Sequence, residues 1–200
     1  MECYTSDSCD SDSREQKTLD LSSKLFDTVE LAIEVDSIID EKNCADRYET
    51  ALLYNNRIKE LPEALNRFAN LKILDVSNNR LTSLSNILEH CPLTSLIAKH
   101  NQLTNESLPK CFNAGKNTLR ELNLSGNRLN FFPEQLLELT SLKYLYLGGN
   151  RIINIPKEIW KLSRRPGRTH YRAASCRVLL KDYDPACLEP LTGREGFQEI

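Results

Sequence analysis

A repeated pattern of apolar and polar positions organises the chain between residues 48 and 162. In the stretch LDVSNNRL, from Leu74 to Leu81, apolar and polar residues alternate before an Asn, and an apolar residue follows that Asn two positions later. Versions of this stretch begin at Ala51, Leu96, Leu122 and Leu145. Alternation of this kind is typical of a short strand with one buried face. The pattern predicts five such strands, each followed by a turn that contains Asn.

The Asn positions recur at an interval typical of a stacked repeat. They are Asn56, Asn79, Asn101, Asn127 and Asn150, and the intervals between them are 23, 22, 26 and 23 residues. A turn inside a stacked coil buries backbone N–H and C=O groups, and an Asn side chain has both a donor and an acceptor to satisfy them. The spacing therefore predicts a ladder of structural Asn amides, with no catalytic role.

Each unit also has a second apolar group after its Asn turn. In the fourth unit this group is Phe132, Leu136 and Leu139, with Pro133 at the start, where a residue that lacks an N–H and has a fixed φ suits a short helical turn. We therefore expect short helices or turns on the convex side. The third unit is the longest, and residues 104–117 are expected to form a fuller helix or a loop.

The segment before the first repeat has the spacing of an amphipathic helix. Phe26, Val29, Ala32, Ile33 and Val35 recur near helical intervals, and an Asp three residues before Glu30 resembles a capping box. Residues 17–47 are thus expected to form a helical cap on the open end of the first coil. The alternative is a helix that docks to a partner.

The two tails differ from the repeats in composition. Residues 1–16 are rich in Ser and Asp and carry five acidic residues against one Arg, which predicts disorder. Residues 163–200 lack the repeat frame and carry seven basic and five acidic residues, and we expect this basic tail to be disordered, with a loose cap formed by residues 177–183 as an alternative. An alternative function for the tail is nucleic-acid association or nuclear import.

Composition limits the remaining possibilities. The 200 residues have a formal net charge of -2 and 40% hydrophobic residues, and no apolar run approaches the roughly 20 residues of a membrane span. Because the N-terminus has no signal-peptide centre, the chain is expected to be intracellular and cytoplasmic, without a membrane partner. The seven Cys residues form no C-x-x-C pair, so we expect reduced thiols, no metal and no cofactor.

Residues suited to catalysis are few. His90 and Cys91 are adjacent, which suggests a hydrolase as a weak alternative, but Cys91 aligns with the core residue Leu139 of another repeat. The glycines before Asn150 lack the Lys and Ser or Thr of a phosphate loop. The chain is therefore expected to be no enzyme and to bind no small-molecule substrate.

The repeat motifs resemble the typical intracellular leucine-rich-repeat class, L-x-x-L-x-L-x-x-N-x-L-x-x-L-P, over residues 48–162. The stretches LDVSNNRLTSL, LIAKHNQL and LNLSGNRL, with the helical segment before them, are similar to the metazoan family of leucine-rich-repeat-containing protein fifty-eight. The resemblance implies an α/β solenoid that binds proteins on its concave parallel sheet, and a role as a substrate-recruiting subunit of a ubiquitin ligase. Members of that family continue with further repeats and a Cys-rich C-terminal segment, which we do not find here.

Candidate partner-binding residues occupy the outward strand positions, where the frame does not dictate the residue type. Several are apolar or aromatic without a core reason, and the candidates are Leu52, Tyr54, Ile73, Ile97, Lys99, Tyr144 and Tyr146. Aromatic residues on a rigid support are enriched at binding hot spots. Strand propensity alone could also explain Tyr and Ile at these positions. We expect the concave face to bind a protein partner.

Overall fold

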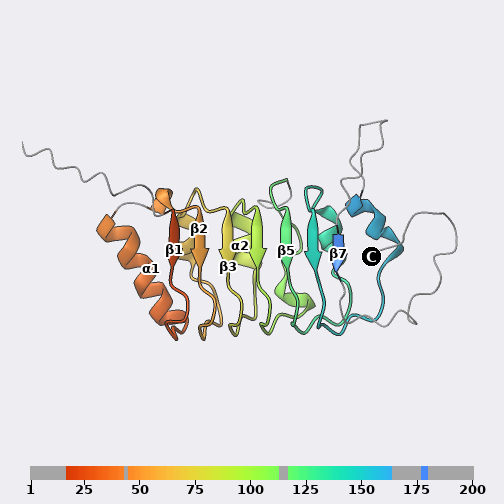
Figure 1. Ribbon diagram of the computed structural model, residues 1–200, viewed down its shortest axis with the longest axis horizontal. Helices are drawn as coiled ribbons and strands as arrows, with labels where there is room; N and C mark the ends of the chain where they lie inside the picture. The colour runs from red at the N-terminus through yellow and green to blue at the C-terminus, as the bar shows by residue number, and fades with distance from the viewer. Residues whose placement is uncertain (1–16, 43–44, 113–116, 164–176, 180–200) are drawn as a thin grey trace, which may run out of the picture.

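The computed structural model describes residues 17–42, 45–112, 117–163 and 177–179. Seven short strands form one parallel sheet in sequence order, as Figure 1 shows. The strands are β1 Thr18–Asp20, β2 Thr50–Leu52, β3 Ile73–Asp75, β4 Ser95–Ile97, β5 Glu121–Asn123, β6 Tyr144–Tyr146 and β7 Arg177–Leu179. The predicted α/β repeat fold is confirmed, and the five expected strands are β2 to β6.

The strands pair in a constant register that stacks equivalent residues. Ala51, Leu74, Leu96, Leu122 and Leu145 are aligned at the centres of β2 to β6, and each is buried. Because alternate side chains of a strand point to opposite faces, the flanking residues of each strand lie on the other side of the sheet. The frame therefore divides the residues into a core face and an outer face.

Short helices complete each coil on the core side of the sheet. They are α1 Thr28–Lys42, η1 Ala45–Arg47, η2 Glu63–Arg67, α2 Ser85–His90, η3 Asn105–Ser107, η4 Glu134–Glu138 and η5 Lys157–Ser163. Figure 1 shows α2 behind the strands, and no helix of the described residues covers the other face of the sheet. We call this uncovered face the open face. It corresponds to the predicted concave side.

Of the two forms expected for the long third unit, a fuller helix or a loop, its described residues show the loop. The second unit contains α2, whereas the long third unit has only the three-residue η3 within its described residues. The rest of its described limb is a loop in which Leu108 and Phe112 are buried. The register between β4 and β5 follows that of the other strand pairs despite the longer unit.

The N-terminal segment is a complete coil and not a helix alone. Strand β1 pairs with β2, and Leu19 and Leu21 join the core. Helix α1 then begins with the expected capping box, since the Asp27 N–H donates to Glu30 Oε2 at 2.9 Å and the Glu30 N–H donates to Asp27 Oδ1 at 2.9 Å. The sequence analysis identified the helix and its first turn, but it missed the strand.

The buried face of α1 also differs from the expected one. Leu31, Val35 and Ile39 pack into the core, whereas Val29 and Ile33 are each 65% exposed. The expectation that Val29 and Ile33 lie on the packed face is therefore wrong. The residues that pack against the first coil recur every four positions along α1. Of these three, the sequence analysis had included only Val35 in the apolar face.

The C-terminal tail contributes one strand to the sheet. Residues 177–179 form β7, which pairs with β6 so that Val178 is aligned with Leu145. For these three residues the structure differs from the expected disorder. The expected disorder of residues 1–16, 164–176 and 180–200 lies outside the described residues.

Candidate partner-binding face

The turn that ends each strand is built around an Asn amide. Asn79 Nδ2 donates to the carbonyl oxygens of Val76 and Ser77 in its own turn, at 3.1 and 3.2 Å. It also donates to Leu53 O of the preceding coil at 2.9 Å, and Asn79 Oδ1 accepts the Ile58 N–H at 3.1 Å. Each ladder Asn therefore bonds to its own coil and to the preceding one.

The same bonds recur along the stack. Equivalent bonds are made by Asn56, Asn101, Asn127 and Asn150. Asn56 takes its preceding-coil partners from the N-terminal coil, where the N–H groups of Lys24 and Phe26 donate to its Oδ1 at 3.1 and 3.0 Å. The ladder thus ties the N-terminal coil to the repeats and holds the strands at a fixed spacing.

The residue before each ladder Asn has a left-handed backbone. The residues and their φ values are Asn55 at 57°, Asn78 at 53°, His100 at 54°, Gly126 at 67° and Gly149 at 68°. Gly and Asn adopt this conformation at low cost, and His is the exception in the third unit. A Cβ added to Gly126 would also lie 2.3 Å from His100 Nδ1. The glycine in the fourth unit therefore accommodates the neighbouring ring.

Two rows of outward side chains run across the open face. One row contains Ile73 and Tyr144, which are 39% and 43% exposed. The adjacent row contains Leu52, Ile97 and Tyr146, which are half-buried. Strands β2 to β4 thus bring the three aliphatic candidates together, and β6 presents two of the three tyrosines, Tyr144 and Tyr146.

The two remaining candidates lie just beyond the strand ends. Tyr54 is half-buried after β2, and Lys99 is exposed after β4. Strand β5 separates the aliphatic group from the tyrosines and carries Glu121 and Asn123 on the open face. The structure therefore places all seven candidates on one side of the sheet, in two groups with a polar strand between them.

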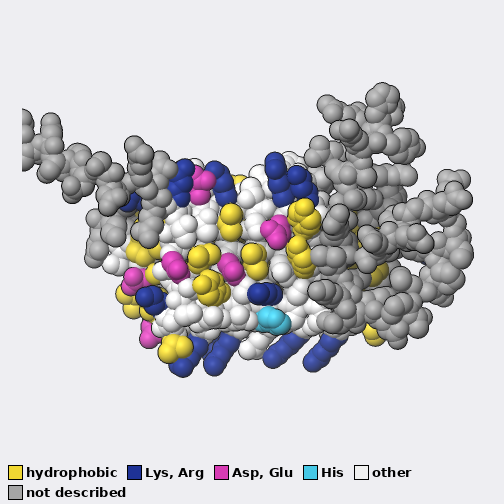
Figure 2. All heavy atoms as spheres, viewed as in Figure 1, with side chains coloured by type: hydrophobic (Ala, Val, Ile, Leu, Met, Phe, Trp, Pro, Cys, Tyr) yellow, Lys and Arg dark blue, Asp and Glu magenta, His cyan; other side chains and the backbone are white. Residues whose placement is uncertain are grey.

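Acidic residues share this face. Asp20 lies in the row of Leu52. Its Oδ1 accepts the Ser22 O–H at 2.6 Å and the Ser22 N–H at 3.0 Å. These two hydrogen bonds hold the pKa of the Asp20 carboxyl below its usual range. Asp75 accepts the same two groups from Ser77, at 2.5 and 2.9 Å. Figure 2 shows acidic and hydrophobic side chains interspersed over the strands, with Lys and Arg side chains along both edges.

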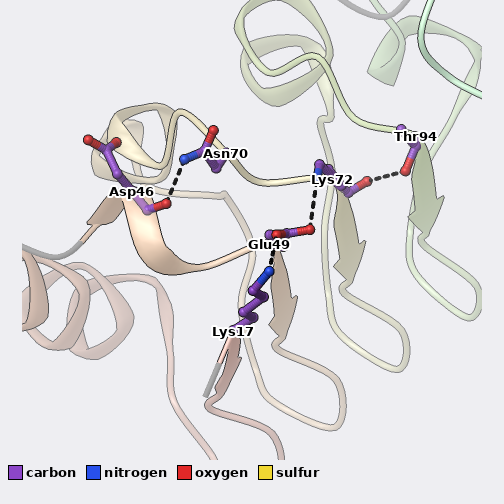
Figure 3. A network of polar contacts seen from close by, with 6 residues as sticks. All are labelled: Lys17, Asp46, Glu49, Asn70, Lys72 and Thr94. Carbon is purple, nitrogen blue, oxygen red and sulfur yellow. Dashed lines mark hydrogen bonds and ion pairs between the residues drawn. The ribbon is translucent and has the colours of Figure 1, made fainter. Parts of the chain in front are cut away.

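A polar network at the edge where the strands begin joins the N-terminal coil to the repeats (Figure 3). Glu49 pairs with Lys17 at 3.0 Å and with Lys72 at 2.7 Å, so that one carboxylate bridges three consecutive coils. The hydrogen bond from Lys72, and to a smaller extent that from Lys17, holds the pKa of Glu49 below its usual range. On either side of this bridge, Asn70 donates to Asp46 O at 2.7 Å and Thr94 donates to Lys72 O at 3.0 Å. The open face is therefore supported by fixed strands.

The adjacent His90 and Cys91 do not form a nucleophile and base. His90 Nδ1 lies 2.9 Å from Asn86 O, and the buried Cys91 Sγ lies 3.5 Å from Asn66 Oδ1. Burial raises the pKa of the Cys91 thiol to about 11, so the thiol is protonated near neutral pH. Cys91 occupies the core position that its alignment with Leu139 predicted, and both side chains are buried.

The described part of the chain contains no group of three or more His, Cys, Asp or Glu side chains placed to hold a metal ion. None of its helices has the length and the apolar composition needed to cross a membrane.

Sequence reasoning missed one member of the face. Asp20 belongs to β1, which had not been recognised as a strand, although Leu19 and Leu21 alternate around it. The Asn, Gly and Pro residues that mark the other coils are missing from residues 18–26, so a three-residue alternation was the sole signal.

Comparison with known families and proteins agrees with the repeat frame. The family described as "Leucine rich repeat" matches residues 108–163, and the one described as "Leucine Rich repeats (2 copies)" matches residues 47–89. Leucine-rich repeat-containing protein 58 of Xenopus tropicalis is 45% identical over 93 residues, which are 46% of this chain and 26% of that protein.

More distant similarities cover a somewhat larger share of the chain. The leucine-rich repeat and calponin homology domain-containing protein of Drosophila melanogaster is 38% identical over 115 residues, covering 58% of this chain and 14% of that protein. A solved LRR protein of Leptospira interrogans aligns with a TM-score of 0.44 and 27% identity, over 59% of this chain and 36% of that chain. The matched region is thus about a quarter of protein 58 and a smaller share of the Drosophila protein.

Proposed function

Because the chain is a leucine-rich-repeat protein, we propose that it is a non-enzymatic adaptor that binds a partner protein on the open face of its sheet. The observation that carries this proposal is the placement of Ile73 and Tyr144, both more than a third exposed, on strands that the Asn ladder holds in register. Repeat solenoids use such extended surfaces for binding. Rigid aromatic side chains lose little conformational freedom on contact and supply large apolar area.

The test replaces the two tyrosines of β6. Changing Tyr144 and Tyr146 together to Ser should weaken partner binding by about 2 kcal/mol or more, as expected for hot-spot aromatics. Because these side chains lie outside the core, the melting transition should correspond to a stability change of only about 0.5 kcal/mol. The measurements are capture of the partner by the full chain, the dissociation constant of the purified pair and thermal melts.

A matched control uses exposed apolar residues away from the open face. Val29 and Ile33 on α1 are each 65% exposed, and changing both to Ser removes a comparable apolar surface. This control should bind normally. If the tyrosine variant also binds normally, the open face is not the binding site.

A finer role, as the substrate-recruiting subunit of a ubiquitin ligase, is implied by the resemblance to the protein fifty-eight family. In that role the captured partner would become ubiquitylated, and the double tyrosine variant would lose this modification together with binding. Ubiquitylation of the partner in cells that produce either form of the chain is the measurement. Modification unchanged by the variant would contradict the role.

Nucleic-acid association through residues 163–200 is the competing proposal, and salt distinguishes the two. Binding that neutralises phosphates weakens steeply as salt rises, whereas contact through aromatic and aliphatic side chains changes little. Charge reversal at Arg164 and Arg165 should leave partner capture intact. If that change abolishes binding while the tyrosine variant binds normally, the binding site is the basic tail and not the open face.

A further inference from the structure

Three carboxylates on the open face lie on alternate strands. Asp20 is on β1, Asp75 on β3 and Glu121 on β5. Asp20 and Asp75 share a row, and Glu121 lies two residues nearer the start of its strand. Among the described residues the ion pairs within 4.0 Å involve Glu49 and Asp40 and none of these three carboxylates, although the charge of Lys24 also lowers the pKa of Asp20.

Among the described residues, the hydrogen bonds of these carboxylates engage one oxygen of each. Asp20 and Asp75 accept the Ser22 and Ser77 groups through Oδ1, and Glu121 accepts the Ser95 O–H through Oε2 at 3.0 Å. The second oxygen of each carboxylate can therefore accept a hydrogen bond from a bound cation. The serine bonds also orient the aspartates, so a partner does not need to order them.

Apolar residues alternate with the carboxylates along the shared row. The order across the sheet is Asp20, Leu52, Asp75, Ile97, Asn123 and Tyr146. Neighbouring strands are about 4.8 Å apart, so Asp20 and Asp75 lie about 10 Å apart with Leu52 between them. Glu121, two strands further on and two residues nearer the strand start, lies about 12 Å from Asp75. A complementary ligand would present cationic groups at this interval and apolar groups between them.

That interval distinguishes a helical ligand from an extended one. In a helix, residues seven apart lie on the same face and are separated by about 10.5 Å. In an extended strand, side chains on one face recur about every 6.6 Å, and the residue about 10 Å away points to the other side. The spacing therefore fits a helix that crosses the strands along the length of the sheet.

We propose that the partner segment on the open face is a cationic amphipathic helix, with Arg or Lys at intervals of about seven residues over Asp20, Asp75 and Glu121. Its apolar residues would contact Leu52 and Ile97, and the helix would end against the tyrosines of β6. This inference rests on the proposed function, since it names the chemistry of the partner at the same face.

The test uses three synthetic peptides of equal length. The first is a helix with Arg at every seventh position and Leu on the same face between them, the second carries Glu in place of Arg, and the third has the composition of the first in scrambled order. The full chain should bind the first peptide at least about tenfold more tightly than either of the others. The Glu peptide lacks the charge pairs with the carboxylates, and the scrambled peptide lacks their spacing. Fluorescence anisotropy at physiological salt measures the three affinities.

Variants of the chain identify the carboxylates involved. Changing Asp75→Asn together with Glu121→Gln should weaken binding of the first peptide about tenfold. The matched control, Asp36→Asn with Glu138→Gln, removes the same charge from exposed positions on α1 and η4 and should leave the affinity unchanged.

Each contrary outcome has a defined meaning. Failure of the first peptide to bind, equal binding of the scrambled or Glu peptide, or equal weakening by both pairs of variants would overturn the cationic-helix inference. If partner capture nevertheless depends on Tyr144 and Tyr146, the proposed function stands without it. If capture does not depend on the tyrosines, the proposed function fails.

Discussion

At the scale of single residues, one amide per coil satisfies backbone groups that no other side chain reaches. Asn56, Asn79, Asn101 and Asn127 are buried, and their Oδ1 atoms accept N–H groups from the preceding coil. An unsatisfied buried donor or acceptor costs roughly 1 to 3 kcal/mol. The ladder therefore stabilises the stack by preventing a penalty in every turn.

Replacing Asn79 by Leu should reveal this penalty. The turn would lose the partners of Val76 O and Leu53 O and of the Ile58 N–H, so we expect a loss of about 1 to 3 kcal/mol in the free energy of unfolding. Urea unfolding of the wild type and of Asn79→Leu measures this loss. Asn130→Leu, at an exposed position, is the control. An unchanged midpoint for Asn79→Leu would exclude the ladder as a stabilising element.

Gly126 offers a second test at this scale. Its φ of 67° costs an L-residue about 1 to 2 kcal/mol, and a methyl group there would displace the His100 ring. Gly126→Ala should therefore destabilise the protein by at least about 1 kcal/mol. In a His100→Gly background the cost should fall to the backbone component alone. Equal costs in both backgrounds would show that the ring gives way freely.

At the scale of elements, α1 is fixed by one stripe of side chains. Leu31 is fully buried, whereas Ile33, two residues later, is 65% exposed. Leu31→Ala should cost about 2 to 5 kcal/mol in urea unfolding, since it leaves a cavity between the helix and the first coil. Ile33→Ala on the same helix should change stability by no more than about 0.5 kcal/mol. Similar costs for the two would mean that α1 packs in another orientation.

The difference between these two residues also shows what the sequence could and could not predict. Apolar residues occur on several sides of residues 26–39, so periodicity did not select the packed face, and docking against the first coil did. The strands β2 to β6 were predictable because five copies of one frame support one another. Strand β1 has two leucines and no marker residue, so it became visible only through its pairing with β2.

The outward face was predictable to the level of residue positions. Alternation around Leu145 placed Tyr144 and Tyr146 on one side, and the structure places both on the open face. The alternation of carboxylates with apolar residues was not visible in full, because its first carboxylate, Asp20, lies on β1, which the sequence did not mark as a strand.

At the scale of the whole molecule, Glu49 connects the N-terminal coil to the second and third coils through Lys17 and Lys72. Because the folded-state pKa of Glu49 is lowered, its contribution to stability is present above the pKa of unfolded Glu and is lost as the pH falls through the folded-state value. Glu49→Gln should therefore be less stable than the wild type at neutral pH, and the difference should vanish in acid.

Urea midpoints of both proteins over a pH series would check this expectation. Glu138→Gln, at an exposed position on η4, is the control and should follow the wild type throughout. If the urea midpoints of Glu49→Gln and the wild type differ by the same amount at every pH, the charge of Glu49 does not contribute to stability. The side chain would then act by shape or by neutral hydrogen bonds.

The direction of the Asn ladder has a consequence for synthesis on the ribosome. Each turn needs an Oδ1 from the coil that follows it in sequence, as the Ile58 N–H needs Asn79. A growing chain therefore emerges with its newest coil incomplete, and completion waits for the next 22 to 26 residues. At about 5 to 20 residues per second that delay is roughly 1 to 5 seconds per coil. The nascent stack would thus stay one unit behind the exit tunnel, with its last apolar edge open to chaperones at every step.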